Sequence, residues 1–403
     1  MTRGHPITAV AIANCLGTDN RTVFERAFAG ADAFSPAGAC YELPFATVLG
    51  IMPGPLTSGA AWSAQGLDYV PTRLATVLSP SVRQLRPAVR AAVDRWGARR
   101  VAYVFASSTG GLEETERSLA PDPRLPLSGA GYRYVDHGID AASAAVAHHL
   151  GVEGVCMAIS TACSSSFNAL ASAIRLIDGG LADAAVVGSA DSLCRTTIFG
   201  FHSLGLTAPT ATQPFARDRA GITLGEGSAY VLIERDAEAT GRHALGWVTG
   251  IGAASDAFHH TSPHPEGIGG QICMRQALDR AGLTPNEIDY VSAHGTGTRL
   301  NDAVEAAAVG QVFERRVPMT ATKSLTGHTL GSAGLTALIL AVESLRRQEI
   351  PATLRAAPLD DSLGVAVVGE PTRVRMQHVL VNAFGFGGSN VSVVVSRPSA
   401  ERS

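Results

Sequence analysis

The sequence predicts a mixed α/β subunit built from two similar halves. Strand-like segments that end in small polar residues recur in the same order in both halves, and helix-length connections separate several of them. The strand ends read SSTGG, STACSSS and GSAD in the first half, and SAHGTGT, TKSLTGHTLGSAG and NAFGFGGSN in the second. Helical crossovers favour sheets that are parallel in part. We therefore expect a duplicated subunit with an N-terminal half at 1–240 and a C-terminal half at 241–403.

Apolar periodicity, with glycines at the stops, predicts the elements in order. The first half should contain a strand and a helix within 7–30, an irregular segment at 31–80, a helix at 82–96, a strand at 100–105, an insertion at 112–150 ending in a helix at 139–150, a buried strand at 155–159, a helix from 164 to 178 and a strand at 184–187. The segment 198–234, which closes the first half, should contain a loop and a strand hairpin. The second half should contain strands within 246–253, a helix at 268–281, a strand at 288–291 and a helix at 302–313. A strand at 317–321, a helix at 335–346 and a final strand pair at 378–381 and 391–395 should follow.

Composition excludes several classes of function. The 403 residues are 46% hydrophobic and 17% charged, which is typical of a globular chain with a large core. The net charge of −3 and the lack of a basic run argue against nucleic-acid binding, and no apolar stretch is long enough to span a bilayer. Six scattered cysteines without a CxxC pair are typical of reduced thiols. We expect a cytoplasmic protein without a zinc site.

Cys163 lies where a predicted strand turns into a predicted helix. Free amides at a helix N-terminus and the helix dipole favour a thiolate. Small neighbours, including Ala162 and Ser164, leave room for a substrate to reach the sulfur. Taken alone, the stretch also fits a buried structural cysteine.

Two histidines stand in glycine-rich turns of the second half, His294 in HGTGT and His328 in TGHTLGSAG. Neutral imidazoles can donate N–H bonds to an oxyanion or enolate, and a thiolate can hold an acyl group. Neither histidine has a second ligand at i, i+4 spacing, so we expect no metal. Lys323 is the only lysine in the chain and could supply charge near the pair, with Glu226 in LGEGS as its carboxylate partner.

The glycine-rich segment GFGGSN at 385–390 offers backbone N–H groups that could form an oxyanion hole. A nucleotide-binding loop is also conceivable, but the sequence has no GxGxxG or GxxxxGK(S/T) motif in a strand–helix context. A GxSxG hydrolase elbow is missing as well.

Six ordered motifs resemble the β-ketoacyl-acyl carrier protein synthases, the condensing enzymes of fatty acid and polyketide synthesis. They are TACSSS, PFARDRAGITLGEG, SDAFHHTSP, HGTGTRLND, TKSLTGHTLGSAG and NAFGFGGSN. The resemblance implies a thiolase-like fold, in which two βαβαβαββ halves form a layered α-β-α-β-α subunit. It also implies a dimer that needs no metal or organic cofactor. Residues 1–100 match the family only loosely.

The resemblance also implies roles for individual residues. Cys163 matches the nucleophile, and the N–H groups of Cys163 and Phe386 match the oxyanion hole. Thr109 matches a position at the pocket floor. The remaining matches are the catalytic histidines His294 and His328, the active-site Lys323 and Glu226, the gate residues Phe386 and Phe201, and the pocket glycines Gly385 and Gly387.

The implied reaction is a decarboxylative condensation between an acyl-cysteine and a malonyl-acyl carrier protein, whose phosphopantetheine arm brings the substrate. Residues 191–205 resemble ketosynthases of polyene-forming type II polyketide systems, which implies a homodimer or a heterodimer with a chain-length-factor homologue. A fatty acid pathway stays open.

Three different functions fit part of the same pattern. One is a non-catalytic partner subunit, which Cys163 and both histidines oppose. The second is a thiolase that uses coenzyme A. A thiolase would need a second cysteine within 384–388, where this chain has none. The third is an initiating ketosynthase, in which asparagine would stand in place of the second histidine, and His328 opposes it.

Overall fold

The computed structural model describes residues 4–53, 62–64, 67–69, 73–119, 137–237, 243–313 and 316–398. Within these residues, one sheet of 11 strands has the order β14-β12-β11-β16-β17-β10-β1-β9-β8-β6-β7. Its strands are β1 (His5–Asn14), β6 (Val101–Ala106), β7 (Cys156–Ile159), β8 (Ala184–Asp191), β9 (Gly227–Glu234), β10 (Gly246–Ser255), β11 (Tyr290–Ser292), β12 (Pro318–Thr320), β14 (Ala366–Val367), β16 (His378–Phe384) and β17 (Ser389–Ser396). Short two-stranded sheets pair β2 (Ser35–Pro36) with β3 (Val48–Leu49), β4 (Trp62–Ala64) with β5 (Leu67–Tyr69), and β13 (Glu349–Ile350) with β15 (Thr372–Arg373).

The strand order shows the duplication. In the first repeat the order is β7-β6-β8-β9-β1, and in the second it is β12-β11-β16-β17-β10, so corresponding strands occupy corresponding places. The pairing directions also match, because the first three strands of each repeat are parallel and the last two pair antiparallel. The repeats join where β1 pairs antiparallel with β10. The expected duplicated α/β architecture is confirmed.

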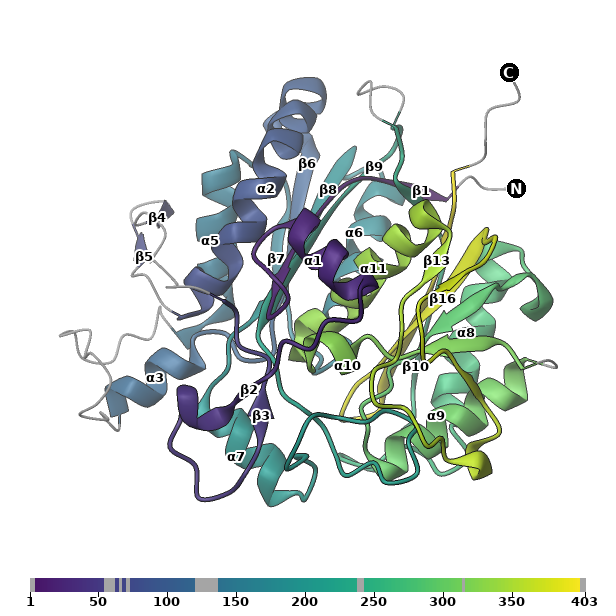
Figure 1. Cartoon of the computed structure of the whole chain (residues 1–403). Helices are drawn as coiled ribbons and strands as arrows, with labels where there is room; N and C mark the ends of the chain where they lie inside the picture. Colours follow the sequence, from purple (N-terminus) through teal and green to yellow (C-terminus); the bar gives the residue numbers. More distant parts are fainter. Residues whose placement is uncertain are drawn as a thin grey trace.

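Helices cover both repeats and fill the space between them, which gives the expected α-β-α-β-α layers (Figure 1). The central layer is formed by α6 and α11, whose Phe167 and Leu338 share one apolar cluster with residues of both repeats. The outer layers are α2 with α5 and α8 with α9, each packed in a cluster of its own. The helices are α1 (Asn20–Phe28), α2 (Arg73–Trp96), α3 (Leu112–Leu119), α5 (Ile139–Leu150), α6 (Ser165–Asp178), α7 (Arg195–Ser203), α8 (Ile268–Ala281), α9 (Arg299–Val312), α10 (Lys323–Thr326) and α11 (Ala333–Arg347).

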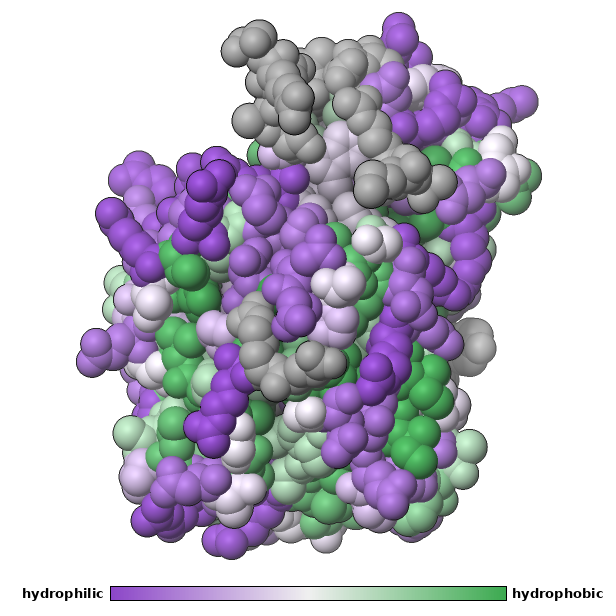
Figure 2. Space-filling view, turned by 90° about the vertical axis from the view of Figure 1, so that its right-hand side faces the viewer, coloured by the Kyte–Doolittle hydropathy of each residue, from purple (hydrophilic) through white to green (hydrophobic). Residues whose placement is uncertain are grey.

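The outer face beside α8 and α9 carries hydrophobic residues interspersed among hydrophilic ones (Figure 2). Ile268 and Ile272 of α8 contribute exposed apolar surface. Scattered apolar residues of this kind are ordinary on a protein surface. Among the helices that the structure describes, none combines the length and the hydropathy needed to cross a bilayer.

The structure corrects the expected start of α2. The sequence predicted an irregular segment up to residue 80 and a helix from 82, but α2 already begins at Arg73 and includes Pro80. Leu74, Val77 and Leu78 of this first part are buried in the apolar cluster under the sheet. Tertiary packing of an apolar face outweighs the hydrogen bond that a proline removes.

Two further expectations were wrong. The segment 198–234 does not form a strand hairpin, because it continues α7 and then supplies the single strand β9, which pairs with β8 and β1. The strand at 155–159 is not buried, since β7 is the last strand of the sheet and its Cys156 is exposed. An apolar run of this length fits an edge strand as well as a central one.

Candidate active site

Cys163 sits in a tight turn between β7 and α6. Ala162, the residue before it, has a φ of 53°, a left-handed conformation that is uncommon outside glycine and is often found at functional sites. The Ala162 carbonyl accepts hydrogen bonds from the N–H and the hydroxyl of Ser165, at 3.1 and 2.6 Å. This turn places Cys163 at the start of α6, with 6% of its surface exposed.

His328 contacts the sulfur directly. Its Nε2 atom lies 2.9 Å from Cys163 Sγ, while its Nδ1 atom accepts a hydrogen bond from the Leu330 N–H at 3.1 Å. A neutral imidazole carries one proton, so an accepting Nδ1 leaves that proton on Nε2. His328 therefore presents an N–H donor to the sulfur and to the cavity around it.

Lys323 sets the tautomer of His294, as the Leu330 N–H does for His328. Its Nζ atom lies 3.1 Å from His294 Nδ1 and 2.5 Å from the His294 carbonyl oxygen. An ammonium donates to both atoms, which again leaves the imidazole proton on Nε2. The rings of His294 and His328 are 5.5 Å apart and nearly perpendicular. The site thus holds two N–H donors within reach of one substrate atom.

Burial sets the protonation states of these groups. Desolvation and the nearby Lys323 charge hold the pKa of both His294 and His328 well below the usual value, so both rings are neutral at pH 7. Desolvation also lowers the pKa of Lys323 to about 8, against the favourable fields of Cys163, Glu305 and Asp302. Lys323 still carries its proton at pH 7.

The resting thiol is neutral, which corrects the expectation of a thiolate. Burial raises the pKa of Cys163 to about 11 and outweighs the lowering effects of the Lys323 charge and of the N–H groups of Phe386 and Cys163 itself. Both N–H groups act on the sulfur, and their service as an oxyanion hole stays a prediction.

Glu226 is not the partner of Lys323, in contrast to the sequence-based expectation. Its carboxylate forms an ion pair with Arg73 at 2.6 Å and accepts the N–H groups of Met52 and Leu193 at 3.0 and 3.4 Å. The LGEGS segment that carries it serves the site through its backbone, because the Gly225 N–H donates to the His328 carbonyl at 3.0 Å.

Glu305 of α9 is the site carboxylate that the sequence analysis missed. It accepts the N–H groups of His294 and Gly295, both at 2.7 Å, and the side-chain amide of Asn382 at 3.1 Å. Its charge also acts on Lys323. The available signal was its position on the predicted helix that follows HGTGT, three residues after Asp302.

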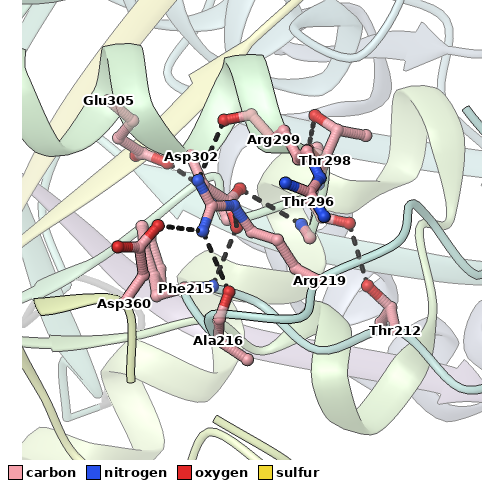
Figure 3. A network of polar contacts seen from close by, with 12 residues as sticks. Thr212, Phe215, Ala216, Arg219, Thr296, Thr298, Arg299, Asp302, Glu305 and Asp360 are labelled. Atoms are coloured by element: carbon pink, nitrogen blue, oxygen red, sulfur yellow. Dashed lines mark hydrogen bonds and ion pairs between the residues drawn. The ribbon is translucent and has the colours of Figure 1, made fainter. Parts of the chain in front are cut away.

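A second buried network also holds the HGTGT turn (Figure 3). Asp302 accepts the N–H groups of Gly297 and Phe215 at 3.1 and 2.8 Å. Arg219 donates to Asp360 at 2.7 Å and to the Ala216 carbonyl at 2.9 Å, and lies 3.9 Å from Asp302. Burial raises the pKa of Asp302 to about 6. The turn that carries His294 is thus fixed by two carboxylates of α9, Asp302 and Glu305.

A cavity opens over these groups, and its empty space, open mouth included, is about 660 Å³. Phe201 and Phe386, the two expected gate residues, stack at 5.4 Å, and Phe386 is 37% exposed. The predicted residues that line the cavity are Cys163, Phe201, His294, His328, Gly385, Phe386 and Gly387.

Thr109 is not among the described residues that line this cavity, and its place at the pocket floor stays a prediction. Its hydroxyl and N–H instead donate to Asp191, at 2.9 and 2.8 Å. Thr109 is buried at the end of β6, where these bonds hold the turn.

The ligand atoms of Cys163, His294 and His328 lie within 4.8 Å of one another, close enough for a metal ion. A metal-bound histidine normally donates its other ring N–H to an acceptor. Here both Nδ1 atoms face donors, Leu330 and Lys323. This pattern favours Nε2–H donors over metal ligands, and the metal-free site stays a prediction.

Comparison with known proteins identifies the family. The model of the β-ketoacyl synthase N-terminal domain matches residues 7–239, and that of the C-terminal domain matches residues 245–357. The chain belongs to the β-ketoacyl synthase family. It is an acyl-transferring condensing enzyme. The exact division at residue 240 stays a prediction.

Individual β-ketoacyl synthases support this assignment. The chain is 33% identical to 3-oxoacyl-[acyl-carrier-protein] synthase 2 of Vibrio cholerae over 323 residues, which cover 76% of this chain and 78% of the relative. A ketosynthase from Xenorhabdus doucetiae, solved in complex with its chain length factor, has a TM-score of 0.88 and 33% identity over 98% of both chains. A β-ketoacyl synthase from Burkholderia phymatum has a TM-score of 0.85 and 25% identity, and covers 98% of this chain and 100% of its own. These structures confirm the thiolase-like fold.

Proposed function

We propose that this β-ketoacyl synthase condenses an acyl group held on Cys163 with malonyl-acyl carrier protein to give 3-oxoacyl-acyl carrier protein. The observation that carries the proposal is the joint placement of the Cys163 sulfur and the two Nε2–H donors of His294 and His328 in one cavity. A nucleophile that holds an acyl group and two donors that stabilise an enolate are what a decarboxylative condensation requires.

The first step is acyl transfer. Cys163 sulfur attacks the thioester carbonyl of an acyl carrier protein, and the N–H groups of Cys163 and Phe386 bind the oxyanion that forms. When the intermediate collapses, the bond to the phosphopantetheine sulfur breaks. The proton lost by the cysteine thiol ends on that leaving thiol, so the exchange balances. His328 donates to the sulfur during the attack.

The second step is decarboxylation. The malonyl thioester oxygen accepts hydrogen bonds from the Nε2–H groups of His294 and His328, which stabilise the enolate as carbon dioxide leaves. Neutral donors suit this role, because neither ring has to lose a proton for the step. Lys323 keeps the His294 proton on Nε2 by donating to Nδ1.

The third step forms the carbon–carbon bond. The enolate carbon attacks the acyl carbonyl on Cys163, and the same two N–H groups bind the new oxyanion. Its collapse releases the 3-oxoacyl thioester and a cysteine thiolate. The thiolate takes up one proton, which restores the neutral thiol favoured by the buried site.

The carrier protein and a second subunit are the proposed partners. The Xenorhabdus doucetiae ketosynthase is in complex with its chain length factor, and its full-length likeness favours a heterodimer of the same kind here over a homodimer. The pathway that we propose is polyketide synthesis, with the polyene-forming class as the narrower proposal, because residues 191–205 resemble ketosynthases of such type II systems. Fatty acid elongation is the alternative. We place the enzyme in the cytoplasm and assign it no cofactor of its own.

The test is product formation. The purified protein, alone and with its chain-length-factor homologue, is incubated with acyl- and malonyl-acyl carrier protein, and the carrier-bound products are identified by mass. We expect a 3-oxoacyl product one acetyl unit longer, and none with Cys163→Ala. Unextended carrier protein under every condition would reject the proposed reaction. Native mass spectrometry of the same samples reports whether the active species is a homodimer or a heterodimer.

A further inference from the structure

Asp191, the last residue of β8, is a buried carboxylate that the proposed mechanism does not use. Its Oδ1 atom accepts four hydrogen bonds from the turn at 107–109. They come from the Ser107 hydroxyl at 2.9 Å, the Ser108 N–H at 2.7 Å, and the N–H and hydroxyl of Thr109 at 2.8 and 2.9 Å. Asp191 therefore holds this turn by a single oxygen.

The second oxygen of Asp191 has the opposite environment. Among the residues that the structure describes, Oδ2 has no hydrogen-bond partner. It faces Gly331, where an added Cβ would lie 2.9 Å from Oδ2 and 2.8 Å from Ser108 Oγ. A buried oxygen without a partner is costly, so its position needs a reason. The hydrogen bonds that Oδ1 accepts from the turn at 107–109 supply that reason.

The turn held by Asp191 reaches the nucleophile. Ser108 Oγ donates to the Ala162 carbonyl at 3.1 Å, and Ala162 is the left-handed residue directly before Cys163. The contacts thus run from Asp191 through Ser108 and Ala162 to the backbone of Cys163. They join the turns that follow β6 and β7, two neighbouring parallel strands.

Electrostatics argues against a role for Asp191 in activating the sulfur. Its negative charge raises the pKa of the Cys163 thiol. A carboxylate placed here to favour a thiolate would have the wrong sign. What Asp191 supplies is geometry.

We propose that Asp191 is a positioning residue for acyl transfer, which holds the 107–109 turn so that Ser108 fixes the Ala162 carbonyl and aims Cys163 at His328 and the cavity. This inference rests on the proposed function. Misplacing a nucleophile by about 1 Å can cost on the order of 10²-fold in rate.

Three variants separate geometry from charge. Asp191→Ala removes the acceptor. Asp191→Asn keeps an acceptor oxygen toward the turn and removes the charge, and its amide nitrogen can occupy the place of Oδ2. Ser108→Ala removes only the link to Ala162. The matched control is Asp183→Asn. Asp183 directly precedes β8, at the end opposite to Asp191, and its substitution breaks ion pairs with Arg100 and Arg235.

Two rates are measured on each variant, the alkylation of Cys163 by iodoacetamide and the acylation of Cys163 by acyl-acyl carrier protein. We expect Asp191→Ala to slow acylation at least ten-fold and Ser108→Ala about five-fold. Asp191→Asn should stay within about two-fold of the wild type in acylation and should be alkylated at least as fast, because the charge that raises the thiol pKa is gone. Asp183→Asn should acylate normally even where it lowers the thermal midpoint.

Carbon dioxide release from malonyl-acyl carrier protein is then compared between Cys163→Ala and the double variant Cys163→Ala/Asp191→Ala. Equal rates are expected, because decarboxylation uses the histidines. The proposal is overturned if Asp191→Ala acylates at the wild-type rate, if Asp191→Asn is as slow as Asp191→Ala, or if the double variant loses decarboxylation. Should Asp191→Ala fail to fold, Asp191→Asn and Ser108→Ala decide alone. A wild type that takes up no acyl group from acyl-acyl carrier protein would reject the proposed function. The alkylation assay needs no carrier protein, so the two failures can be told apart.

Discussion

The Nε2 atom of His328 lies 2.9 Å from the sulfur of Cys163, although the two residues are 165 positions apart. They occupy corresponding places in the two repeats, since one follows β7 and the other follows β12. Counted along the chain, each of these is the third strand that its repeat adds to the large sheet. The duplicated fold therefore brings a nucleophile from one repeat to a donor from the other. The chemistry of the site follows from that meeting.

The two histidines should be needed for decarboxylation. In a Cys163→Ala background, His294→Ala or His328→Ala should lower carbon dioxide release from malonyl-acyl carrier protein by about 10²- to 10³-fold, the usual effect of removing one oxyanion donor. The control is His259→Ala, an exposed histidine that stacks on His260. Unchanged release in either active-site variant would remove that histidine from the mechanism.

Lys323 should give decarboxylation a pH dependence. Burial lowers its pKa to about 8, so the ammonium that holds the His294 proton on Nε2 is present below that pH and is lost above it. The rate of carbon dioxide release should therefore fall as the pH rises through about 8. Lys323→Met should be slower at pH 7 and should lack this fall. A wild-type rate that stays level up to pH 9 would contradict this role.

The same lysine has a consequence for stability. Between pH 8 and its ordinary pKa of 10.5, the unfolded chain binds a proton that the folded protein has released. The free energy of unfolding should therefore rise with pH across this window, relative to Lys323→Met. Chemical denaturation of both proteins at several pH values measures the difference. Parallel curves would mean that the lysine keeps its ordinary pKa in the fold.

Glu226 and Glu305 should separate stability from activity. Glu226→Gln weakens a buried pair with Arg73, and breaking such a pair typically costs about 3–5 kcal/mol, so its thermal midpoint should drop. Glu305→Gln weakens the bonds to the N–H groups of His294 and Gly295 and should lower decarboxylation at temperatures where the protein stays folded. The two variants serve as controls for each other. A selective loss of decarboxylation in Glu226→Gln would restore its predicted catalytic role.

The stacked rings of Phe201 and Phe386 should restrict access to the sulfur. Phe386→Ala keeps the backbone N–H of the oxyanion hole but removes the ring, so iodoacetamide should alkylate Cys163 several-fold faster. Phe201→Ala should have the same direction of effect, since it removes the other half of the stack. An unchanged alkylation rate in both variants would show that the rings do not gate the cavity.

The sequence predicted the parts of the fold and site that depend on local pattern. The helix bounds at 139–150 and 268–281, the turn at Cys163, and the glycine-rich turns of both histidines agree with the structure. Local pattern failed where distant contacts decide. Pro80 was expected to lie outside a helix, but apolar burial extends α2 through it.

The site shows the same division. Glu226 lies in one of the motifs that resemble the family, and this suggested a place in the site. Its partner Arg73, however, comes from a segment that was expected to be irregular. Glu305 had only its place on a helix to mark it, because its contacts are two backbone N–H groups and the distant Asn382 amide. The charge state of Cys163 was also beyond local pattern, since burial outweighs the Lys323 charge and the two backbone N–H groups in setting the thiol pKa.

The most direct test of the central claim is the location of the acyl group after one turnover without malonyl-acyl carrier protein. The protein is incubated with acyl-acyl carrier protein, digested, and mapped by mass. The account predicts one acyl group on the peptide that contains Cys163, and none in Cys163→Ala. An acyl group on another residue, or an adduct that persists in Cys163→Ala, would contradict it.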